Sequence, residues 1–425
     1  MSQSDPVTAL WHPFADMASV SGSGPFVLER GEGTAVWDAD GREYLDATAG
    51  LWFANVGFGR AEIADAVATQ MRALPAYSTF GDFSNAPAEA LAERLSGMAP
   101  VPGSKVFFTS GGSDSVDTAA KMARRYWQLR GHAERTILIH REHAYHGMHT
   151  AGTSLAGIAA NVTGYGQLLG DIVQVPWDDA DALRRAIERG GPDRVAGFFC
   201  EPVIGAGGVF PSPPGYLEAA REVCREAGVL FIADEVITGF CRVGAWFASG
   251  RFDLAPDMLT CAKGITSGYL PMGAVLVAPE VADVFWSSGA GMFRHGYTYS
   301  GHAAVAAAAM ANLDIMEGER LATRALELEV VLSDALAPLA DHTLVSEVRS
   351  GTGVLAAVQL EDEALATDPT LPAKAVAACR AHGLLTRALA TGALQVSPAL
   401  VIEEQGCREI AARIEAALDS LSARA

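Results

Sequence analysis

The run Val-Leu-Phe-Ile-Ala-Asp-Glu-Val (229–236) decides the fold, because its apolar residues end on two acids. A short apolar run of this kind predicts a buried β-strand. A second apolar segment leads into Thr-Cys-Ala-Lys-Gly (260–264). The two runs therefore predict one strand that ends on the carboxylate of Asp234 and another that ends on the amine of Lys263.

Outward from these runs, strand and helix patterns alternate along the chain. Further strands are predicted at 106–109, 136–139, 195–199, 258–261 and 274–277. Apolar residues recur at helical spacing over 61–74, 86–98 and 113–130. Such alternation predicts an α/β protein with a mostly parallel sheet and helices on its faces.

The pattern also predicts two domains. A large domain covers 60–320, and a small α+β domain combines 1–59 with 321–425. In the small domain, 33–45 is predicted to be a hairpin that turns at Asp40-Gly41, because Asp-Gly suits a tight hairpin turn. Residues 1–25 are predicted to be an irregular arm.

Composition limits the class of protein. The chain has 425 residues, of which 50% are hydrophobic and 19% charged, and this is ample for a large core. Its net charge of −19 argues against nucleic acid or an anionic membrane as a partner. The six cysteines lack the spacing of a metal site, and neither a secretory signal nor a membrane-spanning run is found. We expect a cytoplasmic protein.

The lysine and the acid together indicate a particular cofactor chemistry. A lysine amine forms a Schiff base with an aldehyde, and a carboxylate can hold the proton of a basic ring nitrogen. Lys263 and Asp234 therefore point to pyridoxal 5'-phosphate. Val236 could press on one face of its ring and Tyr145, in Ala-Tyr-His-Gly (144–147), on the other.

A phosphate site is predicted where a strand meets a helix. Thr-Ser-Gly-Gly-Ser (109–113) contains Gly111, Gly112 and Ser113, whose backbone N–H groups could turn toward an anion at the helix N-terminus. The spacing matches neither of the common nucleotide-binding loops. An ordinary strand-to-helix turn is the alternative for this stretch on its own.

Four histidines at intervals of three, from His140 to His149, raise the alternative of a metal-dependent hydrolase. The stretch follows a predicted strand and contains Gly147, so it lacks the helical spacing of two zinc-binding histidines. We predict instead a polar loop at the mouth of the site.

The chain resembles the class III aminotransferases that depend on pyridoxal phosphate, from about Leu10 to Leu421. The resemblance rests on Trp-His-Pro-Phe (11–14), Gly-Leu-Trp-Phe-Ala-Asn-Val-Gly-Phe-Gly-Arg (50–60), Phe-Phe-Thr-Ser-Gly-Gly-Ser-Asp-Ser-Val-Asp-Thr-Ala (107–119), Tyr-His-Gly (145–147), Glu-Pro-Val-Ile-Gly-Ala-Gly-Gly-Val (201–209), Asp-Glu-Val-Ile-Thr-Gly-Phe (234–240), Ala-Lys-Gly-Ile-Thr-Ser-Gly-Tyr-Leu-Pro (262–271) and Tyr-Thr-Tyr-Ser-Gly-His (297–302). It is most similar to (S)-selective ω-transaminases of the amine:pyruvate and β-alanine:pyruvate type.

The resemblance implies the fold type I of pyridoxal-phosphate transferases and a role for each matching position. Lys263 would carry the cofactor, Asp234 would pair with the ring nitrogen, and Thr298 would reach the phosphate from the neighbouring subunit. Arg387 would clamp a substrate carboxylate. Trp52 and Phe80 would line the substrate pocket, together with Phe14 from across the subunit interface. Glu201 would lie near the ring, where it would orient neighbouring groups or pair with Arg387.

The implied activity is ping-pong transfer of an amino group from an amine or ω-amino acid to pyruvate or a similar oxo acid. The implied assembly is a homodimer that shares its active sites, or a dimer of such dimers. An aminomutase of the same fold is the alternative within the family. Two departures from the family pattern bear on the site. Gly111-Gly112-Ser113-Asp114 stands where the family loop usually reads Ser-Gly-Ser-Glu, so one hydroxyl donor is lost, and Ile204 stands where many relatives carry glutamine.

Overall fold

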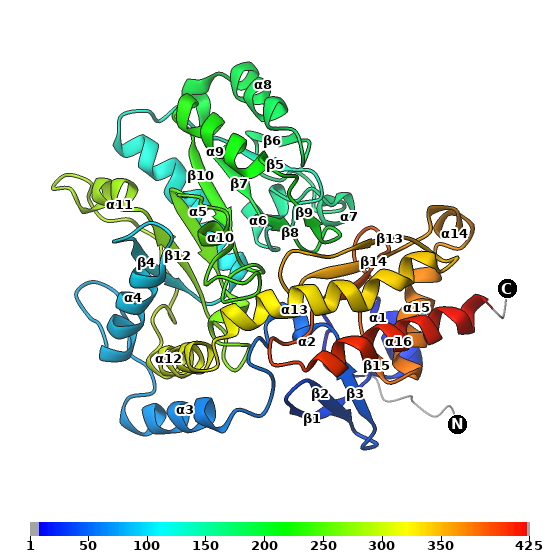
Figure 1. Ribbon diagram of the computed structural model, residues 1–425. Coiled ribbons are helices and arrows are strands. Elements are labelled where there is room, and N and C mark those ends of the chain that lie inside the picture. The colour runs from blue at the N-terminus through cyan, green and yellow to red at the C-terminus, as the bar shows by residue number, and fades with distance from the viewer. Residues whose placement is uncertain (1–7, 423–425) are drawn as a thin grey trace, which may run out of the picture.

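A seven-stranded sheet forms the centre of the chain in the computed structural model, which describes residues 8–422 (Figure 1). Its strands, in spatial order, are β4 (Lys105–Thr109), β12 (Gly273–Val277), β11 (Met258–Cys261), β10 (Leu230–Asp234), β7 (Val195–Cys200), β5 (Ile137–Arg141) and β6 (Ile172–Val175). Only β12 runs antiparallel to its neighbours in this sheet. The predicted mostly parallel α/β sheet is confirmed, and β6 is the one strand of it that the sequence pattern missed.

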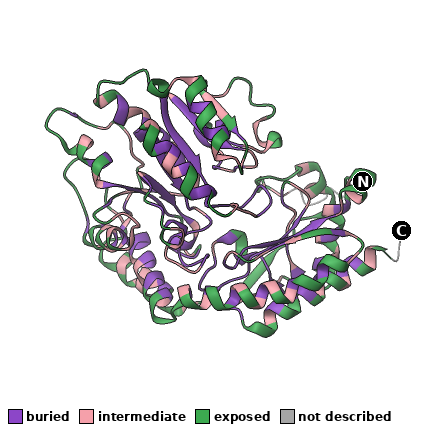
Figure 2. Cartoon of the chain, turned by 45° about the horizontal axis from the view of Figure 1, so that its top comes forward, coloured by how far each residue is buried: buried purple, intermediate pink, exposed green. Residues whose placement is uncertain are grey.

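Helices cover the sheet on both faces, and for this reason its central strands are apolar throughout. Every residue of β7, β10 and β11 is buried, and Figure 2 shows the sheet strands as buried elements flanked by helices with exposed outer sides. Helix α5 (Gly112–Leu129) places Val116, Ala119, Ala123 and Trp127 against the sheet at helical spacing. The indole N–H of Trp127 donates to the carbonyl of Ala196 at 2.8 Å, which ties α5 to β7.

The remaining helices of this half are short to medium in length. They are α3 (Ala61–Ala73), α4 (Ala86–Met98), α6 (Thr150–Ser154), α7 (Ala159–Val162), α8 (Ala180–Gly190), α9 (Tyr216–Ala227), α10 (Ala248–Arg251), α11 (Pro279–Trp286) and α12 (Ala303–Gly318), with the 3-10 turns η1 (Pro192–Arg194) and η2 (Lys263–Ile265). A small two-stranded sheet, β8 (Val203–Ile204) with β9 (Phe210–Pro211), follows β7. None of the helices in 8–422 is long and apolar enough to cross a membrane.

Two smaller sheets and a set of helices lie beside the large sheet (Figure 1). One sheet contains β1 (Leu28–Glu32), β2 (Ala35–Asp38), β3 (Glu43–Asp46) and β15 (Leu384–Leu385), and the other contains β13 (Val345–Arg349), β14 (Ala356–Leu360) and β16 (Leu394–Val396). The accompanying helices are α1 (Met17–Ser23), α2 (Ala49–Trp52), α13 (Leu321–Leu336), α14 (Asp362–Thr367), α15 (Leu371–Ala381) and α16 (Glu404–Ser422), with the 3-10 turn η3 (Ala337–Asp341).

The N-terminal region agrees with the prediction in one part and differs in another. The expected hairpin is present: β2 and β3 pair antiparallel, and Gly41 in the turn has a φ of 78°. The arm before it is not wholly irregular, because Met17–Ser23 forms α1. Asp16 caps this helix by accepting the backbone N–H of Ala18 at 3.0 Å, a local signal that the prediction overlooked. The first seven residues of the predicted arm lie outside the described residues.

One buried arginine links the two groups of elements. Arg242 is fully buried and donates to the carbonyls of Pro398 at 2.6 Å and Val354 at 3.4 Å, and to the side-chain oxygen of Asn55 at 2.5 Å. Burial lowers the pKa of Arg242 to about 9, while the nearby carboxylate of Asp46 opposes the shift. The contacts hold the loop after β10 against both smaller sheets.

Candidate active site

The carboxyl ends of the parallel strands meet at one edge of the sheet, and the candidate site lies there. The loops and turns that follow β5, β7, β10 and β11 carry Tyr145, Glu201, Val236 and Lys263. They surround a cavity of about 120 Å³, and its lining consists of Gly112, Ser113, Val116, Tyr145, His146, Gly147, Glu201, Asp234, Val236, Ile237 and Lys263. Side chains that are far apart in the chain are therefore brought to one place by the direction of the strands.

Lys263 follows β11 directly and begins the turn η2 with a left-handed φ of 46°. Its neighbour Gly264 has no room for a side chain, because an added Cβ would lie 2.6 Å from Asn55 Nδ2 and 2.8 Å from Phe240 Cβ. Burial lowers the pKa of Lys263 to about 8, whereas Asp234 and Glu201 act to raise it. In mildly alkaline solution, far below the usual pKa of a lysine, a substantial fraction of this amine is therefore neutral and available as a nucleophile or a base.

Asp234 ends β10 and is almost completely buried. Its Oδ1 accepts hydrogen bonds from Thr260 Oγ1 and from the backbone N–H of Val236, both at 3.1 Å. Its Oδ2 lies 2.6 Å from His146 Nδ1, and since a carboxylate only accepts, this nitrogen carries the proton. The carboxylate is thus oriented by three donors within the chain.

His146 is a site residue that the sequence analysis did not identify. The four histidines were predicted to form a polar loop at the mouth of the site, but His140 and His146 are buried. The His146 ring packs on Phe199 with centroids 5.7 Å apart, and its Nε2 is buried without a hydrogen-bond partner. The position of His146 directly after Tyr145, in the loop that follows a strand, was the available signal.

The histidines do not converge on a common point. His149 is exposed and its Nε2 lies 2.6 Å from Asp114 Oδ1, while His146 contacts Asp234. Burial lowers the pKa of His140 to about 4, and the neighbouring His146 adds to the effect. Within residues 8–422, no group of three or more His, Cys, Asp or Glu side chains is arranged to hold a metal ion. The geometry gives no support to the metal-dependent hydrolase.

Glycines allow the backbone to approach the cavity closely. A Cβ on Gly112 would lie 2.8 Å from Val236 Cγ1, and a Cβ on Gly147, which has a φ of 86°, would lie 2.5 Å from Ser113 Oγ. Helix α5 begins at Gly112, so its first backbone N–H groups have no acceptor within the helix and open toward this space. Ser113 Oγ accepts the N–H of Met148 at 3.1 Å, which joins the two glycine-containing loops. The donor set suits an anion such as a phosphate.

Glu201 is held within the loop that follows β7. Its two carboxylate oxygens accept the backbone N–H groups of Tyr145 and Gly205, each at 3.0 Å. Burial raises the pKa of Glu201, although the neighbouring His146 acts to lower it. Two roles were expected for Glu201: to orient groups near the ring or to pair with Arg387. Its carboxylate orients the backbone of Tyr145, and it forms no ion pair with Arg387.

Arg387 and Trp52 lie against each other. The guanidinium carbon of Arg387 is 4.6 Å from the centre of the Trp52 ring, and Tyr145 packs against the same apolar cluster as Trp52. Burial lowers the pKa of Arg387, and Tyr145 opposes that shift. The structure thus brings the predicted arginine next to one of the predicted aromatic pocket residues.

Three of the predicted residues are exposed at the surface and lie away from the cavity lining of a single chain. Phe14 and Phe80 are 75% and 55% exposed, and Thr298 is also exposed. Other aromatic residues at the surface include Tyr77 and Phe83, whose rings are 5.4 Å apart. Gly111 lies next to the cavity as the residue that caps α5, with an extended backbone.

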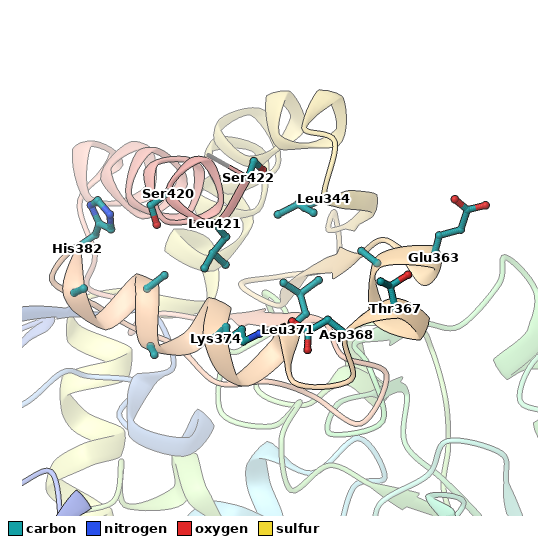
Figure 3. A pocket seen from close by; sticks show the side chains of 14 residues that line it. Leu344, Glu363, Thr367, Asp368, Leu371, Lys374, His382, Ser420, Leu421 and Ser422 are labelled. Carbon is teal, nitrogen blue, oxygen red and sulfur yellow. Dashed lines mark hydrogen bonds and ion pairs between the residues drawn. The ribbon is translucent and has the colours of Figure 1, made fainter. Parts of the chain in front are cut away.

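A larger cavity, of about 930 Å³, lies far along the chain between α14, α15 and α16 (Figure 3). Its lining is a mixture of leucines, alanines and scattered polar groups. The charged side chains Lys374 and Asp368 form an ion pair with each other at 2.7 Å. This cavity lacks the buried acid, base and nucleophile that meet in the smaller one, so we place the chemistry in the smaller cavity.

Comparisons with known proteins agree with this geometry. The sequence profile of the family described as "Aminotransferase class-III" matches residues 17–418. The chain is 37% identical to the putrescine–pyruvate aminotransferase of Pseudomonas aeruginosa, over 97% of this chain and 94% of that protein. Two similar solved structures are an (S)-enantioselective ω-transaminase from Thermomicrobium roseum (TM-score 0.93, 38% identity, 96% of each chain) and a PLP-bound amine transaminase from an uncultivated Pseudomonas species (TM-score 0.92, 35% identity, 98% of this chain and 99% of that one).

Proposed function

The chain belongs to the class-III aminotransferase family, and from this premise we propose that it is an ω-transaminase that depends on pyridoxal phosphate. The proposed reaction moves an amino group from an amine or ω-amino acid to pyruvate or a similar oxo acid. The names of the related putrescine–pyruvate aminotransferase and amine transaminase support this choice of substrates.

The residues around the cavity fit pyridoxal phosphate. The glycine-rich start of α5 offers backbone donors for the phosphate, and Val236 and Tyr145, which both line the cavity, would contact the faces of a flat ring. Asp234 supplies a buried acceptor for a protonated ring nitrogen. When bound, this cofactor withdraws electrons from the substrate carbon that loses its proton.

Lys263 has two tasks in this proposal. Its amine would hold the cofactor covalently until an amino donor replaces it. Once released, the neutral amine would take the α-proton of the donor and deliver it to the neighbouring carbon of the cofactor. The pKa of about 8 suits both tasks, because a substantial fraction of the amine is unprotonated in mildly alkaline solution.

Asp234, supported by His146, would hold the protonated ring nitrogen of the cofactor. The His146 N–H and the Thr260 hydroxyl both donate to the Asp234 carboxylate, so its oxygens are held in a fixed orientation in which they would accept the N–H of the ring. Arg387 would hold the carboxylate of the oxo acid, because a guanidinium binds a carboxylate through two parallel hydrogen bonds.

We further propose a homodimer in which each subunit completes the site of the other. The exposure of Phe14 and Thr298, which lie outside the cavity of their own chain, supports this arrangement. A cytoplasmic location is supported by the six cysteines, all of which are buried and free. Sedimentation at micromolar concentration tests the dimer, and a monomer with full activity would contradict it.

The observation that carries the proposal is the meeting of Lys263 and Asp234 in one glycine-lined cavity. The purified yellow holoenzyme is mixed with each enantiomer of 1-phenylethylamine, β-alanine, γ-aminobutyrate or putrescine, without an oxo acid. We expect at least one donor to abolish the absorption band that makes the holoenzyme yellow, and addition of pyruvate to restore this band.

Two variants sharpen this experiment. Lys263→Ala should lose turnover by many orders of magnitude, whereas the exposed Lys105→Ala should keep it. Near-normal turnover by Lys263→Ala would refute the assignment. If no donor bleaches a protein that does hold the cofactor, or if product forms without any oxo acid, an aminomutase becomes the better description.

A further inference from the structure

The side chain of Arg387 is partly buried beside the cavity without a carboxylate to balance it. Within residues 8–422 no aspartate or glutamate offsets its charge, and its buried Nε has no hydrogen-bond partner. A buried charge without a partner is costly and normally acquires a counter-charge. The aromatic face of Trp52, 4.6 Å away, is the group that takes this place.

Trp52 is itself fixed by an unusual piece of backbone. The short element α2 is not a regular helix, because Ala49, Gly50 and Trp52 have positive φ values of 47°, 69° and 62°. The buried carboxylate of Asp46 stabilises this turn by accepting the N–H of Thr48 at 2.8 Å, the hydroxyl of Thr48 at 2.6 Å and the N–H of Gly50 at 2.6 Å. Trp52 is only 2% exposed and belongs to a buried apolar cluster, so its indole is also held by packing.

The segment that carries Arg387 is hydrogen-bonded to the strand that precedes Trp52. Strand β15 pairs in parallel with β3, so that Leu385 is opposite Asp46, and the N–H of Ala47 donates to the carbonyl of Leu385 at 3.0 Å. The carbonyl of Arg387 accepts the N–H of Gln395 at 3.0 Å. The indole and the guanidinium thus belong to segments that directly follow two strands hydrogen-bonded to each other.

We propose that Trp52 is a positioning residue for carboxylate recognition. Its indole holds the Arg387 guanidinium in the site when no counter-ion is present. The hydrogen-bonding edge of the guanidinium then stays free for the carboxylate of an oxo acid. The inference rests on the proposed transaminase function. It differs from a simple pocket-wall role, because it makes the contribution of Trp52 depend on Arg387 and on the charge of the ligand.

Holding the guanidinium in advance lowers the ordering cost of carboxylate binding. A desolvated cation–π contact of this kind corresponds to roughly a tenfold change in affinity. The indole face is also occupied by the cation, so a substrate without a carboxylate must either share the site with the arginine or displace it. Trp52 would therefore set the balance between oxo acids and amines that lack a carboxylate.

The test compares propionate with its neutral isostere propionamide, neither of which can exchange an amino group. Dissociation constants are measured by titration of the holoenzyme for the natural protein, Trp52→Phe, Trp52→Leu, Arg387→Leu and the double variant Trp52→Leu/Arg387→Leu. Trp52→Leu should weaken propionate about tenfold more than propionamide, and Trp52→Phe about threefold, because a phenyl ring attracts a cation less than an indole. In the Arg387→Leu background, the replacement of Trp52 should change propionate binding by less than about twofold.

Equal losses for both ligands, or the same loss with and without Arg387, would overturn the proposal and leave Trp52 as a wall of the pocket. If Trp52→Leu does not fold, the comparison of Trp52→Phe with the natural protein decides by itself, since an unchanged preference for propionate contradicts the role. Failure of the transaminase function would show separately in the bleaching experiment: no amine would bleach the natural holoenzyme.

Discussion

Replacement of Lys263 by methionine should stabilise the cofactor-free protein at neutral pH while it abolishes turnover. Methionine has a similar length and no charge, so it removes the charge from the buried site without a large cavity. Burial lowers the pKa of the Lys263 amine from 10.5 to about 8. At about 1.4 kcal/mol per pKa unit, this shift corresponds to about 3 kcal/mol of unfavourable free energy for the buried ammonium group.

The pH dependence follows from the two pKa values. Below pH 8, Lys263 is protonated in both the folded and the unfolded chain, and the folded state carries the full cost of the buried charge. Between pH 8 and 10.5 the folded protein binds fewer protons than the unfolded chain, so its stability rises with pH. Above the unfolded pKa the cost is absent, and the natural protein and Lys263→Met should then be equally stable.

Urea unfolding of the cofactor-free proteins at one protein concentration measures this difference. We expect Lys263→Met to be more stable by about 3 kcal/mol at pH 7 and by much less at pH 9.5. Lys105→Met, at an exposed position on β4, is the matched control and should show no such pH-dependent gain. If Lys263→Met is no more stable than the natural protein at pH 7, or if its advantage does not shrink with rising pH, then the ammonium group is not buried as described.

Three further outcomes are expected. Gly147→Ala should weaken cofactor binding at least tenfold, because its Cβ would meet Ser113 Oγ at 2.5 Å, whereas Gly164→Ala, with a similar positive φ and open space around it, should bind normally; equilibrium dialysis of the cofactor distinguishes them. The rate of bleaching by an amine, followed by stopped flow, should rise with pH if the released amine of Lys263 accepts the proton, because only the neutral amine is a base, and a flat profile would contradict that role. Arg242→Met should destabilise the protein by about 3 kcal/mol, because it leaves three buried oxygen atoms without their donor, and an unchanged midpoint of thermal unfolding would show that these hydrogen bonds add nothing net.

The sequence by itself determined the main elements of the large sheet and the two residues on which the chemistry depends. Strand β11 spans the predicted residues, and β4, β5, β7, β10 and β12 differ from the prediction by one or two residues at an end. Hydrophobic periodicity is a local property, so it can be read without knowledge of which strands pair. Strand β6 was missed because its short run, Ile172–Val175, includes a polar residue and is only partly buried at the edge of the sheet.

Only the tertiary structure decided which side chains meet. The contact of His146 with Asp234 joins residues 88 positions apart, and the stacking of Arg387 on Trp52 depends on the pairing of β15 with β3. Likewise, the antiparallel direction of β12 and the anchoring of Tyr145 by Glu201 follow from strand order. A residue type and its immediate neighbours determine local conformation, but the distance between two side chains depends on how the whole chain packs, and for this reason the partners of the catalytic groups became visible only in the folded protein.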